Sequence, residues 1–376
     1  MKDKINIFTI SDIHLGHLRN KTSDIIKHLE LYITDNIELI KELDLFIIAG
    51  DLFDKLLTTK SIEYSMILRF MSKVFILCKT YNIKLRVLEG TPSHDYKQLK
   101  PFVEVITEVT KGVDFKYIDY LDIEWIEDLG INVLYIPDEW KHNAKDTFKE
   151  VQEKLKEKNI EEVDIAIMHG CFKYQIPLLK DMNFTHEEID YLNIVKYYIF
   201  IGHIHTHSTY ERILAPGSFD RLVHGEEELK GGIFATIYNT GEMDYKFICN
   251  PYATPFITLN YNDVDLEVET LVNKILKDLK TYNISVNDFH LRILLKDNTY
   301  INILTEMIKK KIPDVTLTFK TNKFKELQEN IEKQELNVIE INPNNIYNLV
   351  SEKIDLLEIS NEKKKSIKML FKTYVS

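Results

Sequence analysis

The sequence has few of the features that mark a secreted or membrane-bound protein. Its three cysteines, Cys78, Cys171 and Cys249, lie far apart and give neither a disulfide framework nor a paired metal-binding motif. Residues 1–14 carry charge and then alternate like a strand, with no apolar stretch long enough for a signal peptide or a membrane span. We therefore expect a cytoplasmic protein with no membrane partner.

Positive charge is also scarce. The chain has 48 Lys and Arg residues against 59 Asp and Glu residues, a formal net charge of −11. This balance argues against a protein that holds nucleic acid by a large basic surface of its own. It leaves a nucleic-acid substrate open, because metal ions or a partner subunit can supply positive charge to phosphates.

What the sequence has is a regular alternation of apolar runs and helix-like segments over its first two hundred residues, which predicts an α/β domain. The predicted strands are 5–10, 43–49, 84–89, 131–136, 163–168 and 197–202. Apolar residues at steps of three and four predict helices over 23–41 and 62–81. After residue 202 the pattern changes to shorter strands and turns.

The remainder of the chain divides into two further parts. Residues 256–320 alternate strand, helix, strand, helix and strand, which predicts a small α+β module. The charge-dense residues 323–334 are typical of a linker or solvated helix, and two amphipathic helices are predicted at 343–356 and 361–373. We expect domains at 1–253 and 254–321, followed by a linker and helical segment at 322–376.

Acidic and histidine residues follow five of the predicted strands. They are Asp12, Asp51, His94, His169 and His203. In open α/β sheets, ligands bind at the carboxyl ends of the strands, so these side chains are expected to lie together.

Two of the short motifs place a pair of ligands on one face. In SDIHLGH, Asp12 and His14 are two residues apart on an extended segment, and in FIGHIHTH the same holds for His203 and His205. An isolated D-x-H is equally explained by a turn aspartate beside a solvated histidine, whereas GHIH is more specific. The carboxylate and imidazole of the first pair can bind one ion.

The other motifs contribute single residues. In AGDLFD, Asp51 has two carboxylate oxygens and can bridge two metals, whereas Asp54 is interpreted as a helix-start or supporting residue. EGTPSHD puts His94 and Asp95 in a loop, and IMHG puts His169 at a strand end. Alone, His94 is better explained as an exposed histidine in a turn, and His169 can be explained as a core residue hydrogen-bonded to the backbone. Seven of the twelve histidines lie in or beside these motifs, which indicates a metal site: 14, 17, 94, 169, 203, 205 and 207.

The order D-x-H, G-D-x-x-D, G…H-D, H-G and G-H-x-H resembles the calcineurin-like metallophosphoesterase superfamily over residues 5 to about 225. The spacing of SDIHLG and GDLFD, and APGSFDR after GHIH, resemble the SbcD family of DNA repair exonucleases and its phage relatives. The resemblance implies a β-sandwich flanked by helices, then a small α+β capping domain and a C-terminal helical segment. If a phage encodes the chain, the expected location is the host cytoplasm.

The resemblance also implies roles for the motif residues. It implies Asp12, His14 and His205 as ligands of one metal, His169 and His203 as ligands of the other, and Asp51 as the bridge. His94 matches the catalytic histidine of the family, and Asp95 would orient it. The family reads G-N-H-D where this chain reads G-T-P-S-H-D, so Ser93 stands in the place of the asparagine ligand. Because a hydroxyl is a poorer neutral ligand than an amide oxygen, the second metal is expected to bind more weakly.

The expected function is hydrolysis of DNA phosphodiester bonds by two divalent metals, in DNA repair, recombination or replication, with exonuclease and endonuclease activity. A mixed Asp/His site without thiolates suits manganese, iron or zinc, and Mn²⁺ is the ion we expect. One alternative is a phosphatase or phosphodiesterase acting on a small molecule or phosphoprotein. The other is a non-catalytic scaffold, which only Ser93 favours.

The expected partners are DNA, a coiled-coil ATPase of the SbcC type and a second copy of the chain. Residues 342–374 are the candidate docking segment for the ATPase, because their apolar residues fall at helical steps. The helix after Thr58 is a candidate surface for the homodimer.

Overall fold

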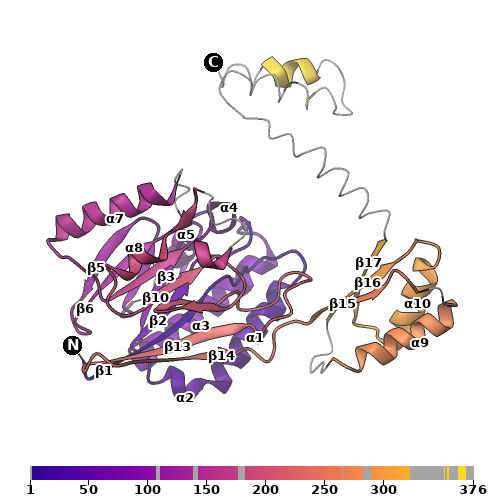
Figure 1. Ribbon diagram of the computed structural model, residues 1–376, viewed down its shortest axis with the longest axis horizontal. Coiled ribbons are helices and arrows are strands. Elements are labelled where there is room, and N and C mark those ends of the chain that lie inside the picture. Colours follow the sequence, from indigo (N-terminus) through magenta and orange to yellow (C-terminus); the bar gives the residue numbers. More distant parts are fainter. Residues whose placement is uncertain are drawn as a thin grey trace.

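The computed structural model describes residues 2–106, 111–138, 143–176, 183–264, 266–282, 289–321, 351, 354 and 363–369. Two six-stranded mixed sheets form the larger part (Figure 1). The first sheet runs in the order β14 (Met243–Cys249), β13 (Gly231–Tyr238), β1 (Lys4–Ile10), β2 (Leu45–Ala49), β3 (Lys84–Leu88) and β4 (Phe115–Ile118). The second runs β11 (Ser208–Tyr210), β12 (Ile213–Ala215), β10 (Ile199–Gly202), β7 (Ile165–His169), β6 (Ile131–Ile136) and β5 (Asp122–Ile126).

The two sheets pack face to face. In β1, Ile5 and Ile7 point into a cluster that also holds Val133 of β6 and Ile167 of β7. Alternate residues such as Ile10 point the other way, toward helices. Strands buried on both faces read as continuous apolar runs, which is why the sequence pattern was legible.

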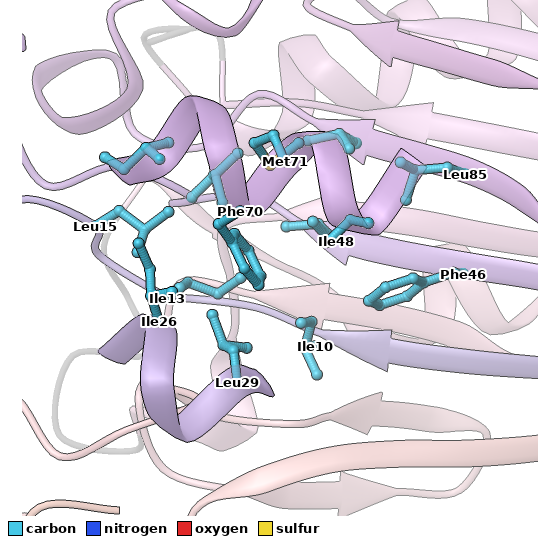
Figure 2. Packing of buried hydrophobic residues seen from close by; sticks show 14 of the residues in the cluster. Ile10, Ile13, Leu15, Ile26, Leu29, Phe46, Ile48, Phe70, Met71 and Leu85 are labelled. Carbon is cyan, nitrogen blue, oxygen red and sulfur yellow. The ribbon is translucent and has the colours of Figure 1, made fainter. Parts of the chain in front are cut away.

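Helices cover the outer face of each sheet, as the α/β prediction requires. Helices α1 (Thr22–Asp35) and α3 (Ile62–Tyr81) cover the first sheet, where Leu29, Phe70 and Met71 pack near Ile10 and Ile48 (Figure 2). On the second sheet, α7 (Ala144–Lys158) and α8 (Glu188–Leu192) contribute Val151, Leu155 and Tyr191 to a separate cluster. The fold is therefore an α/β sandwich of two mixed sheets between helical layers, the arrangement expected of a metallophosphoesterase.

One predicted helix is interrupted in the structure, and another has the predicted bounds. The predicted helix 23–41 is two helices, α1 and α2 (Ile37–Ile40), because Asn36 interrupts it and donates its side-chain amide to the Tyr32 carbonyl at 2.9 Å. Helix α3 begins and ends where predicted. The Ser61 hydroxyl caps its first turn by accepting from the Tyr64 amide, and Asn82 ends it in the left-handed conformation.

The α+β module after residue 255 contains a parallel sheet. Its strands are β15 (Phe256–Tyr261), β16 (His290–Leu295) and β17 (Thr316–Thr321), and α9 (Val268–Leu279) and α10 (Ile301–Lys311) join them in sequence. The two helices pack on one face of the sheet, with Ile257, Ile293, Ile275 and Leu304 in a cluster of their own. The predicted domain boundaries at 254 and 321 stay predictions.

Most of the predicted C-terminal segment lies outside the described residues. Residues 363–369 are helical, within the helix predicted at 361–373, and so are residues 351 and 354 of the helix predicted at 343–356. In the part of the chain that the structure describes, none of the helices has the length and apolar character to cross a membrane.

Candidate metal centre

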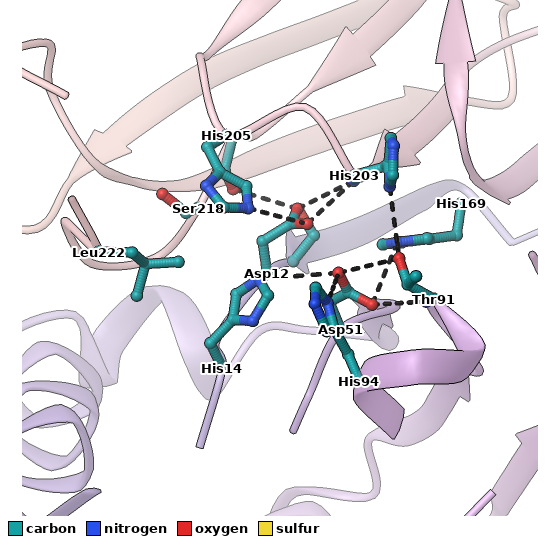
Figure 3. Close-up of polar contacts among 12 residues, drawn as sticks. Asp12, His14, Asp51, Thr91, His94, His169, His203, His205, Ser218 and Leu222 are labelled. Carbon is teal, nitrogen blue, oxygen red and sulfur yellow. Dashed lines mark hydrogen bonds and ion pairs between the residues drawn. The ribbon is translucent and has the colours of Figure 1, made fainter. Parts of the chain in front are cut away.

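The ends of strands from both sheets meet at one edge of the sandwich, and the motif residues gather there (Figure 3). Asp12, His14, Asp51 and His203 follow their strands in a backbone conformation of positive φ, at 50°, 54°, 50° and 101°. Non-glycine residues adopt such angles at a cost of about 1–3 kcal/mol each, and such strain concentrates at functional sites. Hydrogen bonds between the loops stabilise this strained backbone, because the amides of Ile13 and His14 both donate to the Asp51 carbonyl.

Asp12, His14 and His205 form the first group that could hold a metal, with one ligand atom from each lying within 4.8 Å of the others. The Asp12 carboxylate is fully buried and accepts the His203 amide at 3.0 and 3.1 Å. The Nε2 atom of His14 is buried and makes no hydrogen bond within the described residues. Since a buried polar atom is rarely left without a partner, this nitrogen suits a metal ion.

A second group contains Asp51, His169 and His203. The Asp51 carboxylate lies 3.3 Å from Nε2 of His169 through one oxygen and 3.7 Å from Nε2 of His14 through the other. The two oxygens therefore face the two groups. This is the geometry that a bridging carboxylate needs.

Hydrogen bonds fix the far side of three of these imidazoles. Nδ1 of His14 lies 3.0 Å from Asp54, Nδ1 of His205 lies 3.0 Å from Glu226, and Nδ1 of His169 lies 2.8 Å from the Ala49 carbonyl. An imidazole that donates through Nδ1 presents the lone pair of Nε2 to a metal. Asp54 thus has the supporting position that its sequence suggested. Glu226 was not anticipated, because nothing in its local sequence marks it.

The charges in the centre are strongly coupled. Burial by itself would raise the pKa of Asp51, but the neighbouring imidazoles, led by His169, hold that pKa well below its usual range. Burial opposes the charge on His169, yet Asp51 raises its pKa to about 10. Both ring nitrogens of His169 therefore carry a proton in the metal-free chain, and a metal that binds Nε2 must displace the proton there.

Thr91, and not Ser93, lies in the second group. Its hydroxyl oxygen is 3.2 Å from Asp51, 3.4 Å from Nε2 of His169 and 3.4 Å from Nδ1 of His203. Ser93 is exposed on the short helix α4 (Pro92–Asp95). The expectation that Ser93 is a ligand stays a prediction, and its exposed position on the helical turn that begins at Pro92 does not favour it.

His94 and Asp95 have different surroundings. The His94 ring is partly exposed, and its Nδ1 lies 2.9 Å from Asp51. This hydrogen bond raises its pKa. Asp95 is buried and accepts the backbone amides of Phe53 at 2.8 Å and Gly90 at 2.7 Å. The expected role of Asp95 in orienting His94 is thus indirect, because its carboxylate shapes the loop that carries the histidine.

Comparisons with known proteins add little. No protein-family model matches the chain, and no curated protein matches it. One solved chain is 15% identical with a TM-score of 0.38, covering 65% of this chain and 100% of its own length. TT1561 of Thermus thermophilus is 11% identical with a TM-score of 0.38, covering 65% of this chain and 98% of its own.

Proposed function

We propose that this protein is a two-metal phosphodiesterase that hydrolyses DNA, as a nuclease subunit of the SbcD type. One observation carries the proposal: Asp51 faces two adjoining groups of buried and half-buried side chains, one with Asp12, His14 and His205 and one with His169 and His203. Buried carboxylates and imidazoles without a counter-ion would be costly, and divalent cations offset that cost. The ligand types suit Mn²⁺.

The residues divide the work of such a reaction. Two bound divalent ions would activate a water molecule and neutralise the negative charge of the phosphodiester. His94 stands at the partly exposed side of the centre, and its hydrogen bond to Asp51 raises its pKa, which favours the form that carries a proton to donate. It is placed to donate that proton to the leaving oxygen. Asp54 and Glu226 hold the rings of His14 and His205 in the orientation that binding requires.

A basic surface supports DNA as the substrate. It consists of Arg19, Arg292 and Lys320, which lie around His224. His224 lies 3.2 Å from Thr258 of β15, and Thr258 pairs with Arg292 of β16 on the sheet face that α9 and α10 leave uncovered. Burial and then Arg292 lower the pKa of His224 to about 4, with Arg19 and Lys320 acting in the same direction. Nε of Arg292 is buried and makes no hydrogen bond within the described residues. In a chain of net charge −11, this gathering of positive charge favours a phosphate backbone.

The basic surface and the metal centre share one loop. Glu226, which holds His205, is two residues from His224. We propose that a DNA strand bound at Arg292 runs from this loop toward the first group of ligands. A small phosphate ester would need no such surface.

The test is to assay the full chain with Mn²⁺ on linear duplex DNA and on an aryl phosphodiester. We expect both to be hydrolysed, both reactions to stop with a chelator, and His94→Asn to slow both by about 10²–10⁴-fold, as for loss of a general acid. Hydrolysis of the small ester alone would leave the small-molecule alternative. If neither substrate is cleaved and His94→Ala leaves an ATPase complex unaffected, the scaffold alternative holds.

We also propose an SbcC-type ATPase as the partner, bound through residues 342–374. A chain this acidic gains the positive charge that DNA binding needs from such a subunit. Removing the residues after 340 should abolish co-purification with the ATPase and leave the metal-dependent hydrolysis of the aryl diester intact. Continued association would refute the assignment.

A further inference from the structure

The second group of ligands contains a hydroxyl that the sequence motifs did not mark. We propose that Thr91 supplies the neutral oxygen ligand of the second metal position and sets its affinity, an inference that rests on the two-metal function proposed above. The nearby hydroxyl of Ser93 has no such role, because it is exposed on α4.

The contacts of the Thr91 hydroxyl support this. Its oxygen lies 3.2 Å from Asp51 and 3.4 Å from both Nε2 of His169 and Nδ1 of His203. The hydroxyl is therefore within reach of all three residues of the second group, where a neutral oxygen could join them around one cation.

The backbone before Thr91 keeps the hydroxyl in place. The Thr91 amide donates to the Asp51 carboxylate at 2.5 Å. A Cβ atom on Gly90 would lie 2.1 Å from the Asp51 amide nitrogen, so only glycine lets the two loops come this close. Thr91 is therefore held by the same carboxylate that faces both groups.

The two metal positions also differ in the number of negatively charged ligands. The first has a full carboxylate of its own in Asp12, besides the shared Asp51. Among the described residues whose ligand atoms lie within 4.8 Å of one another, the second has the shared carboxylate and two imidazoles, with the Thr91 hydroxyl beside them. A neutral hydroxyl adds less attraction for a divalent ion than a carboxylate does, so occupancy of the second position should depend on Thr91.

The experiment is a Mn²⁺ titration of the metal-free full-length chain, followed by calorimetry and by the electron paramagnetic resonance signal of free Mn²⁺. The native chain should bind two ions, one more tightly. Thr91→Val keeps the shape and removes the hydroxyl, and it should weaken the second ion by about 10–100-fold while leaving the first unchanged. Thr91→Ser should restore the second ion, and Thr91→Asn, with an amide oxygen, should bind it at least as tightly as the native chain.

Ser93→Ala is the matched control, because it removes a hydroxyl two residues away, and it should bind both ions normally. Two native affinities in Thr91→Val would overturn the proposal. Equal weakening of both ions would also overturn it, because that result means Thr91 only positions the shared Asp51. Circular dichroism checks that each variant is folded.

Failure of the proposed function would look different. If the native chain binds two ions and Thr91→Val loses one, the ligand assignment stands even where no diester is cleaved. If diesters are cleaved and Thr91→Val titrates like the native chain, the function stands and the ligand assignment falls.

Discussion

The two halves of the metal centre are built differently. In the first, the rings of His14 and His205 are each held by a carboxylate, Asp54 and Glu226. In the second, His169 is held by the backbone carbonyl of Ala49. A carboxylate behind a ligating imidazole makes the ligand more basic and fixes its orientation, and a carbonyl does so without charge. The first position should therefore bind its metal more tightly than the second.

Asp51→Asn tests what the two halves share, and we expect the largest effect there. The amide would remove the one negative charge that faces both groups, so both metals should bind weakly. Hydrolysis of an aryl diester should fall by at least about 10³-fold, because the charge stabilisation by two ions is lost. Metal content and rate are the measurements. A variant that keeps the first metal at native affinity would show that the halves are independent.

Acid should lower the stability of the fold near the second half of the centre, because a buried histidine, His186, lies beside it. His186 lines a cavity of about 100 Å³ together with His169 and His203. Burial lowers the pKa of His186 from an ordinary 6.5 to about 4. The unfolded chain therefore binds the proton more tightly, and stability is full above pH 6.5 and falls as the pH drops toward 4.

The loss should approach about 3 kcal/mol below pH 4, from a pKa difference of about 2.5. Denaturant unfolding of the metal-free chain between pH 7 and pH 4 measures it. His186→Gln should flatten the curve over this range. An unchanged pH dependence in that variant would assign the acid sensitivity elsewhere.

Glu226→Gln tests the first half alone. Loss of the carboxylate behind His205 should weaken the first metal by about 10–100-fold and leave the second unchanged. The matched control is Glu228→Gln, because Glu228 contacts Lys230, as Glu226 does, but does not contact His205. Equal effects of the two variants in a Mn²⁺ titration would mean that the charge of the loop matters and the contact does not.

Arg292→Glu should separate the metal centre from the basic surface, with the smallest effect. Both metals and the hydrolysis of an aryl diester should be unchanged. The dependence of DNA affinity on salt should lose about one unit of slope, as expected for one lost phosphate contact. Lys149→Glu, an equal charge change on an exposed position of α7, serves as the control. The same slope in both variants would remove this surface from the DNA path.

The halves of the centre also differ in how far the sequence predicts them. The grouping of Asp12, His14, Asp51 and His169 was predictable, because each lies at the end of a legible apolar strand or shortly after it, and strand ends converge. The position of Thr91 beside Asp51 and the exposed position of Ser93 were not predictable, because they depend on a single helical turn that begins at Pro92.

Elements with few apolar residues were missed for a similar reason. The buried face of helix α7 consists of Ala144, Thr147, Val151 and Leu155, set in a strongly charged sequence, so its apolar periodicity did not predict it. Strands β4 and β5 lie at the edges of their sheets, where burial is incomplete and the apolar pattern is weak. Glu226 is brought to His205 by a loop, which has no periodicity to read.

The left-handed backbone at Asp12, His14 and Asp51 lowers the stability of the fold at the residues that would bind metal. Each residue occupies a conformation that glycine would adopt without strain, and two of them bury a carboxylate. In the absence of metal, the chain should be less stable with these side chains than without them. If only thermal stability were selected, Asp12, His14 and Asp51 would therefore be among the first residues to be replaced. A requirement for metal binding would oppose their replacement.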